Sequence, residues 1–247
     1  MIYTPNFFTL DGKSSADFNA WIATSNMFNG AEHDDNTVEI PGRNGAVVFS
    51  NGRYKNFTAN VSCYIPHGMR ENVDGLRSWL STKWDYVKYR EEYRPGEFRL
   101  VRYKGGFALS KSDRVGAAFT LKFDCKPQRF LDAGEIPTRY TANGEIYNPT
   151  LYTAEPLITL KGTPGVSGAF NIKGNQTINF KFPNSGTIII DVENGEAYDT
   201  DGTNLNNNVS FHASNTAQDF PRIAPGSNAV LMWNVASVEI VPRWWTI

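Results

Sequence analysis

The chain has 247 residues, of which 13% are aromatic and 20% are charged, and its formal net charge is -1. A chain of this length forms one large or two ordinary domains and can bury a sizeable core without needing disulfides or bound metals for stability. Because acidic residues balance the basic ones, there is no basic field to neutralise phosphates, so we expect no nucleic-acid partner. No stretch approaches the roughly 20 apolar residues of a membrane span, and the first residues lack a signal-peptide pattern. We therefore expect a protein that is made in a cytoplasm and contacts no membrane.

Two long alternations dominate the first block, residues 1–131, and predict two-faced strands of an antiparallel sheet over 56–65 and 117–126. Their apolar rows are Phe57, Ala59, Val61, Cys63 and Ile65, and Ala117, Phe119, Leu121, Phe123 and Cys125. Shorter strands are expected at 37–40, 45–49, 85–90, 98–103 and 107–110. The Asn51-Gly52 pair between extended segments predicts a hairpin turn.

A helix is expected over 70–82, because Val73, Leu76, Trp79 and Leu80 fall on one apolar face. Gly75 weakens this prediction. A single helix among strands usually covers one face or open end of a sheet.

The remainder of the chain reads as a linker followed by a second β domain. Residues 132–150 carry glycines and prolines with little periodicity, which is typical of a linker or arm. In residues 151–247, short predicted strands separated by Gly, Pro, Asn and Asp indicate a β-sandwich. These strands are expected at 157–161, 168–173, 177–182, 186–192, 208–211 and 229–241.

Candidate reactive groups do not assemble into a known chemical pattern. His33, His67 and His212 are scattered, whereas a metal site needs clustered ligands. The segment 199–204 lacks the later ligands of a calcium loop, and a polar turn explains it more simply. The acidic pairs 34–35, 91–92 and 193/196 lie in expected turns, and no nucleophile or phosphate-loop motif is present. We therefore expect no enzymatic activity, no cofactor and no metal.

The two cysteines, Cys63 and Cys125, both lie on the inward rows. Reduced core thiols are favoured, while a disulfide between neighbouring strands stays open. Trp244 and Trp245, near the end of the chain, are interpreted mainly as rings that pack on the second domain. The alternative is an exposed platform on which a sugar ring stacks.

An ordered series of short motifs extends over nearly the whole chain, although no single one is specific. The series is Phe8-x-Leu10-Asp11-Gly12, Ile40-Pro41-Gly42-Arg43-Asn44-Gly45, Phe123-x-Cys125-Lys126-Pro127-x-x-Phe130, Asn148-Pro149-Thr150, Ala154-Glu155-Pro156-Leu157-Ile158, Phe220-Pro221-x-Ile223-x-Pro225-Gly226-x-Asn228 and Pro242-Arg243-Trp244-Trp245. In this order it resembles the distal tail proteins of bacteriophages with long non-contractile tails.

That resemblance implies a mainly β, two-domain structural protein of the virion. Its N-terminal domain, sandwich-like with one helix and a β-hairpin arm, is expected to form a homohexameric ring at the tail tip. The ring would join the tail-tube protein to a tail tip, baseplate or tail-associated protein, after assembly in the host cytoplasm. The C-terminal domain is expected to be a sandwich similar to galectins and carbohydrate-binding modules.

Contacts between ring subunits are expected from strand edges at 37–49 and from an arm-like region at 83–111, by strand addition. Arg43 lies in a turn between glycines, and we hypothesise that it reaches across a subunit boundary; the alternative is a solvated arginine. The rival function is a carbohydrate-binding protein that recognises glycans of a host cell wall. It would use exposed aromatic rings and could act as a monomer.

Overall fold

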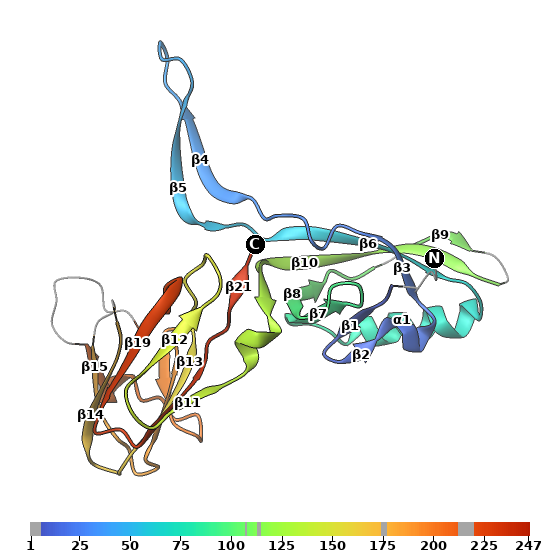
Figure 1. The fold of residues 1–247 in the computed structure, drawn as a ribbon. Helices are drawn as coiled ribbons and strands as arrows, with labels where there is room; N and C mark the ends of the chain where they lie inside the picture. Colours follow the sequence, from blue (N-terminus) through green and yellow to red (C-terminus); the bar gives the residue numbers. More distant parts are fainter. Residues whose placement is uncertain (1–5, 107, 113–114, 174–176, 212–219) are drawn as a thin grey trace. The chain divides into compact units, whose positions relative to one another are not determined.

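The computed structural model describes residues 6–106, 108–112, 115–173, 177–211 and 220–247. The chain forms two compact units, Met1–Arg129 with Ile247, and Phe130–Thr246. As expected from the sequence, both units consist mainly of antiparallel strands (Figure 1). No helix among the described residues is both long and apolar enough to span a membrane.

The first unit is built on one large sheet in the order β2-β1-β7-β8-β10-β6-β3, with β9 also paired to β10. Its elements are β1 (Phe8–Leu10), β2 (Lys13–Ser14), the 3-10 helix η1 (Ser15–Phe18), β3 (Trp21–Ser25), β6 (Phe57–Ile65), α1 (Met69–Ser81), β7 (Val87–Glu91), β8 (Glu97–Tyr103), β9 (Leu109–Ser112) and β10 (Ala117–Leu131).

Strands β6 and β10 are direct neighbours, paired from Ala117 opposite Ile65 to Cys125 opposite Phe57. The two predicted alternations are confirmed, because their apolar rows share one face of the sheet and enter one core cluster. The predicted strands at 85–90 and 98–103 are β7 and β8, which occupy the interior of the sheet between β1 and β10. The expectation of an arm over 83–111 is therefore wrong for these two strands.

Helix α1 packs on the core face of this sheet (Figure 1). The predicted apolar face is confirmed, since Val73, Leu76, Trp79 and Leu80 are the buried residues of the helix. Gly75, which weakens helix propensity, has a packing reason. A Cβ atom at this position would lie 3.0 Å from the ring of Phe18.

A separate hairpin, β4 (His33–Glu39) with β5 (Ala46–Tyr54), lies within the connection between β3 and β6. The two strands predicted at 37–40 and 45–49 are its distal halves. The hairpin turn expected at Asn51-Gly52 is wrong, because these residues lie inside β5. They coincide with a register shift, where His33 opposes Tyr54 but Asp35 opposes Ser50. The extra residues of this bulge accommodate Gly52, whose φ of 67° suits glycine.

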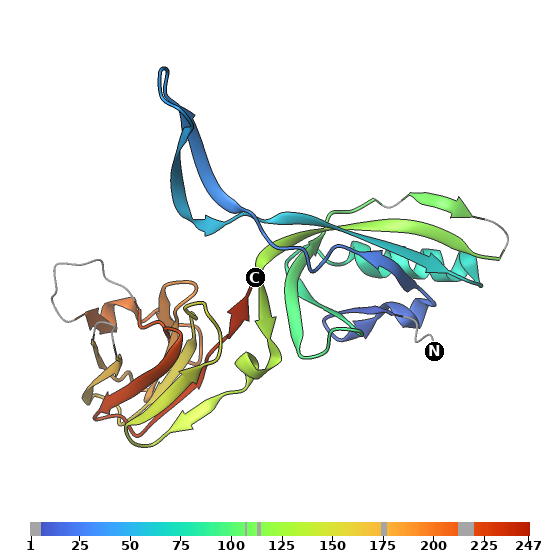
Figure 2. The same ribbon diagram turned by 45° about the horizontal axis from the view of Figure 1, so that its top comes forward.

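The second unit consists of two five-stranded sheets, β11-β20-β13-β16-β17 and β12-β19-β14-β15-β18, packed around a common core (Figures 1 and 2). Its elements are η2 (Asp132–Glu135), β11 (Thr138–Tyr140), β12 (Gly144–Asn148), β13 (Leu157–Lys161), β14 (Ser167–Ile172), β15 (Ile178–Lys181), β16 (Thr187–Asp191), β17 (Glu196–Tyr198), η3 (Asn206–Asn208), β18 (Val209–Phe211), β19 (Gly226–Trp233), β20 (Ser237–Val241) and β21 (Trp245–Thr246).

The segment expected to be a linker, residues 132–150, instead contributes strands to both sheets of the sandwich. β11 pairs with β20, and β12 pairs with β19. Its glycines and prolines mark the turns between short strands, and strands this short show little periodicity. The strand expected over 229–241 is divided into β19 and β20 by a turn at Asn234, which has a φ of 53°.

We expect Leu76→Ala to lower the free energy of unfolding of the first unit by about 3 kcal/mol, because it leaves a cavity under α1. Leu76 is fully buried in the core cluster. Ser78→Ala, at an exposed site of the same helix, should change it by less than about 0.5 kcal/mol. Urea unfolding of both variants measures the difference, and an equal effect would contradict the packing role of the helix.

Candidate assembly surfaces

The β4–β5 hairpin presents hydrophobic side chains to solvent and pairs with no other strand of the described residues. Val38 and Val47 are opposite each other, and Phe49 lies on the same face because residues alternate along a strand. Val38 is 47% exposed and Phe49 is 59% exposed. Two-stranded hairpins are marginally stable alone in water, so burial of this apolar row against a partner would stabilise the hairpin.

The base of the hairpin is held by an ion cluster that joins its two strands. Arg53 Nε donates to Asp34 Oδ2 at 2.7 Å, and Lys55 Nζ lies 3.7 Å from Asp34 Oδ1. The hydrogen bond from Arg53 holds the pKa of the Asp34 carboxyl below its ordinary value. Asp34 is thus part of a structural ion pair that joins the two strands of the hairpin.

Arg43 lies at the tip of the hairpin, where the backbone N–H of Arg43 donates to the carbonyl of Ile40 at 3.1 Å. Gly42 and Gly45 flank it with φ angles of 83° and 78°, which few other residues adopt. The side chain is exposed and makes no ion pair with any residue that the structure describes. This placement leaves the guanidinium accessible to another molecule.

Both cysteines are buried and free, which confirms the interpretation as reduced core thiols. They lie on the paired strands at well-separated positions, Cys63 opposite Phe119 and Cys125 opposite Phe57. Burial raises the pKa of Cys63 and raises that of Cys125 to about 12. Both thiols are therefore protonated at neutral pH and are poor nucleophiles.

The remaining acidic candidates also serve structure. The buried carboxylate of Glu91 accepts hydrogen bonds from Tyr89 and Ser25 at 2.7 Å each, and from Asn6 at 3.3 Å. In the segment 199–204, Asp199 Oδ1 accepts the backbone N–H groups of Asp201 and Thr203, which is the polar turn expected from the sequence.

Within the described ranges, no group of three or more His, Cys, Asp or Glu side chains could hold a metal ion. The ring of His33 contacts that of Tyr54, and the carbonyl of His67 accepts amide hydrogen bonds from Asn19 and Asn72. The third histidine, His212, lies outside the described residues.

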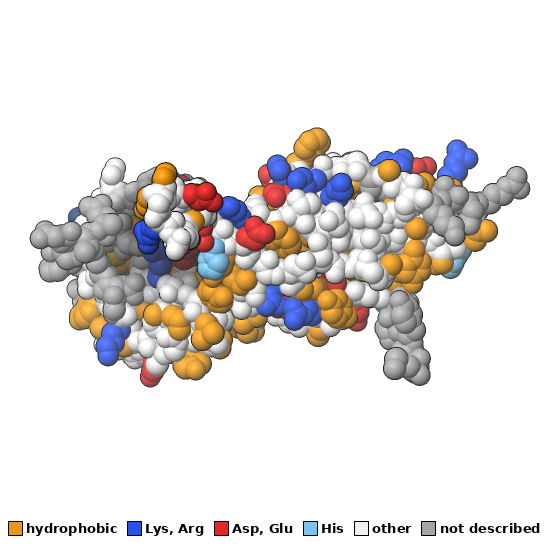
Figure 3. All heavy atoms as spheres, turned by 90° about the horizontal axis from the view of Figure 1, so that it is seen from above, with side chains coloured by type: hydrophobic (Ala, Val, Ile, Leu, Met, Phe, Trp, Pro, Cys, Tyr) orange, Lys and Arg blue, Asp and Glu red, His pale blue; other side chains and the backbone are white. Residues whose placement is uncertain are grey.

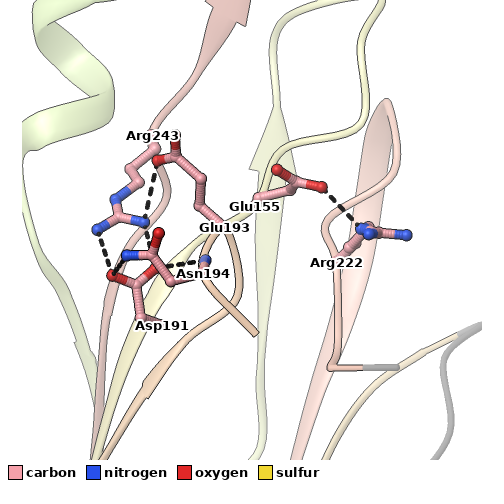
Figure 4. Close-up of polar contacts among 6 residues, drawn as sticks. All are labelled: Glu155, Asp191, Glu193, Asn194, Arg222 and Arg243. Carbon is pink, nitrogen blue, oxygen red and sulfur yellow. Dashed lines mark hydrogen bonds and ion pairs between the residues drawn. The ribbon is translucent and has the colours of Figure 1, made fainter. Parts of the chain in front are cut away.

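Arg243, from the last motif of the series, closes the second unit with an ion cluster (Figure 4). Its guanidinium binds both carboxylate oxygens of Asp191, at 2.7 and 3.3 Å, and lies 3.5 Å from Glu193. Asn194 donates its side-chain amide to the same carboxylate at 2.9 Å. Burial would raise the pKa of Asp191, but the hydrogen bonds from Arg243 hold it below its ordinary value. A neighbouring ion pair joins Arg222 to Glu155 at 3.0 Å.

Two asparagines of the motif series organise buried turns. The Asn148 amide donates to the carbonyls of Tyr152 and Ile223, and its oxygen accepts from Thr150. Asn228 donates to the carbonyls of Ala224 and Gly226 and accepts the N–H of Ala224. Both side chains sit below the surface, so their polar atoms require these partners.

The C-terminal tryptophans mainly pack, as expected. Trp244 is 6% exposed and belongs to the core of the sandwich. Trp245 donates its indole N–H to the carbonyl of Thr153 at 3.0 Å and stacks on Tyr152, with ring centroids 4.4 Å apart.

A groove on the second unit was not anticipated from the sequence. It has a volume of about 400 Å³ and is lined by Ser167, Gly168, Ala169, Asn179, Phe180, Lys181, Asn208, Ser210, Trp233 and Asn234. Its residues come from four strands, the 3-10 helix η3 and a turn, so only the pairing of the sheet brings them together. The local signal was the strand expected at 229–241, which included Trp233 but did not assign it to a face.

Charges on the face shown in Figure 3 are mixed. Lys and Arg side chains are interspersed there with acidic and hydrophobic ones and form no extended basic patch. This distribution accords with the formal net charge of -1.

Most of the first unit matches a known protein family. Residues 20–125 match the phage tail protein RIFT-related domain family. The matched residues include α1, the β4–β5 hairpin and the paired segments of β6 and β10. No curated protein matches the sequence.

Two solved structures extend the similarity over the whole chain. The Dit protein of phage SPP1, described as a paradigm of the hub adsorption apparatus in phages that infect Gram-positive bacteria, aligns with a TM-score of 0.73 and 13% identity over 99% of this chain and 100% of that chain. A chain of the phage p2 baseplate in its activated conformation aligns with a TM-score of 0.55 and 14% identity over 96% of each chain. The fold is thus that of a distal tail protein, and the resemblance derived from the motif series is confirmed.

We expect Arg243→Met to lower the free energy of unfolding of the second unit by about 3 kcal/mol at pH 7, because it leaves the buried carboxylate of Asp191 unpaired. The pKa of Asp191 is lowered in the folded state. Its stabilisation by Arg243 is therefore present above the unfolded-state pKa and is lost as pH falls through the folded-state pKa.

The gap between the variant and the original protein should accordingly narrow below about pH 4. Denaturant unfolding at pH 7 and at pH 3 measures this dependence. The double variant Asp191→Asn with Arg243→Met is the matched control, and it should recover part of the loss. A gap that is the same at both pH values would show that the ion pair is not responsible.

Proposed function

We propose that this protein is a distal tail protein, a structural hub of a phage tail that forms a sixfold ring. The ring joins the tail tube to the tail tip or baseplate and keeps a central channel open. The protein acts at the tail tip after assembly in the host cytoplasm, with no catalytic turnover and no cofactor. The observation that carries this proposal is the phage tail domain with its unpaired, partly apolar hairpin.

A ring requires one surface of each copy to fit a different surface of the next copy. The hairpin suits this role because it offers two open strand edges and an apolar row on one face. Strand addition at either edge would satisfy its free backbone groups. The formal net charge of -1 limits repulsion between neighbouring copies. We propose that the tail-tube protein and a tail tip protein contact the two faces of this ring.

The first test is the absolute mass of the purified protein, measured by light scattering over a range of concentrations, with negative-stain images of the same peak. Particles of six subunits with a central hole would support the proposal. A protein that stays monomeric even when mixed with the tail-tube and tail tip proteins of the same phage would contradict it.

A sharper test changes the hairpin. We expect Val38→Lys to weaken self-association by at least about tenfold, because it places a charge in the apolar contact. Thr37→Lys adds the same charge to the neighbouring residue on the opposite face of the hairpin and should have a much smaller effect. Both sites are exposed, so neither variant should alter folding. Sedimentation velocity measures both, and normal rings of the Val38→Lys variant would exclude this face from the interface.

Arg43 remains our candidate for a contact across the subunit boundary. Its backbone is fixed by the turn, whereas its side chain has no ion-pair partner among the described residues. We expect Arg43→Ala to weaken ring formation by roughly tenfold, as the loss of one charged hydrogen bond would. Arg53→Ala, at the base of the hairpin, is the control. It loosens the hairpin but keeps the Arg43 side chain, so it distinguishes a loosened hairpin from the loss of the Arg43 contact. Unchanged rings of a normally folded Arg43→Ala variant would exclude the contact.

A further inference from the structure

Five asparagines of the chain are followed directly by glycine: Asn29, Asn44, Asn51, Asn143 and Asn194. Such a pair can cyclise without an enzyme, because the backbone nitrogen of the glycine attacks the side-chain amide carbon of the asparagine. Glycine has no Cβ to obstruct this attack and tolerates the backbone rotation that ring closure requires. The reaction needs a free side-chain amide and a backbone that can rotate, so the structure around each pair determines where it occurs.

The two pairs of the second unit are held by hydrogen bonds. Asn143 Oδ1 accepts the backbone N–H of Met232 at 2.9 Å, and the glycine that follows is part of β12. The side-chain amide of Asn194 donates to the carboxylate of Asp191 at 2.9 Å. Cyclisation at either pair would first have to break these hydrogen bonds.

Two pairs of the first unit are restrained in other ways. The carbonyl of Asn29 accepts a hydrogen bond from the buried guanidinium of Arg99 at 3.1 Å. This bond fixes the peptide plane that also contains the attacking glycine nitrogen. Asn51 lies inside β5, where its side chain hydrogen-bonds to Asp34. The N–H of the glycine that follows donates to Ser50 Oγ at 3.3 Å, so its nitrogen is already engaged.

Asn44 differs from the other four. It lies at the tip of the hairpin, beyond the last strand pair, in which Glu39 is opposite Ala46. Its side chain is exposed and makes no hydrogen bond with any residue that the structure describes. Apart from its chain neighbours, no atom lies within 4 Å of the place that a Cβ of Gly45 would occupy. The amide is therefore free, and the backbone has room to rotate.

We propose that Asn44 is a site of spontaneous deamidation and the fastest of the five pairs. The nitrogen of Gly45 bonds to Cγ of Asn44, and the side-chain nitrogen leaves as ammonia with the proton of the Gly45 N–H. The product is a cyclic imide. Water then opens the imide at either of its carbonyls and yields aspartate or isoaspartate. The sequence consumes only water, and no atom is oxidised or reduced.

The modification changes the tip next to Arg43, which directly precedes Asn44. It adds a carboxylate that attracts the guanidinium of Arg43 and competes for it with any outside partner. Isoaspartate also lengthens the backbone of the turn by one methylene group. If the tip contacts the next copy, a step that rests on the proposed function, modified copies would assemble less well.

The test is peptide mapping by mass spectrometry after the full chain has been incubated in a mildly alkaline buffer. Chymotrypsin cleaves after aromatic residues, so it separates the peptide 29–49, which contains Asn44, from the peptide 50–54, which contains Asn51. Fragment ions distinguish Asn44 from Asn29 within the first peptide. We expect Asn44 to convert at least about tenfold faster than the other four, because each of those must first lose a hydrogen bond.

The same incubation in concentrated urea is the control, because all five pairs should then convert at similar rates. Asn44→Gln should abolish conversion at the tip and leave the other pairs unchanged, since the larger ring that glutamine would form closes far more slowly. Similar rates at all five pairs of the folded protein would overturn the proposal. An Asn44 that stays intact in the folded protein but converts in urea would overturn it as well.

The effect on assembly is measured with two variants of the tip. Asn44→Asp carries the charge of the modified protein, and Asn44→Gln is its neutral match. In sedimentation velocity, we expect Asn44→Asp to associate roughly tenfold more weakly than Asn44→Gln. Equal association of the two variants would overturn the effect on assembly. Peptide mapping needs no ring, so the deamidation site and the proposed function can fail separately.

Discussion

The pairing of β6 with β10 is the constraint on which the rest of the first unit depends. Its register places Phe119 opposite Cys63 and Phe123 opposite Ala59, so both inward rows build one face. A shift of one residue would turn every one of these side chains to the other face. Because α1, β1 and β7 cover or extend the same core, they have a defined place only once this register is set.

The same pairing accounts for the position of the hairpin. β3 and β6 are neighbours in the sheet, and the whole β4–β5 hairpin is an insertion between them. Long insertions between paired strands cost little free energy, since loop-closure entropy grows only slowly with length. The sheet therefore supports a projecting element whose own stability is marginal. An element of this kind is suited to a contact with another molecule, and it lies within the residues that match the phage tail family.

The second unit shows how motifs with no chemical signature determine a structure. Asn148 and Asn228 donate hydrogen bonds to backbone carbonyls of buried turns. Arg243, near the end of the chain, forms an ion pair with Asp191. These residues define the scaffold of the sandwich, and none of them touches the groove. A fold of this kind does not by itself imply a function.

Alternation and helical periodicity were sufficient to predict the two long strands, α1 and the mainly β class, because these patterns report burial directly. The Asn51-Gly52 signal misled, since a glycine at positive φ fits a bulge as well as a turn, and only the pairing of β4 with β5 distinguishes them. The strands at 138–140 and 144–148 were missed because the first has only three residues and the second has a single buried hydrophobic residue, Ile146. The exposure of the hairpin and the groove beside Trp233 both depend on which strands become neighbours. That choice is made by long-range packing, which no local pattern in the sequence encodes.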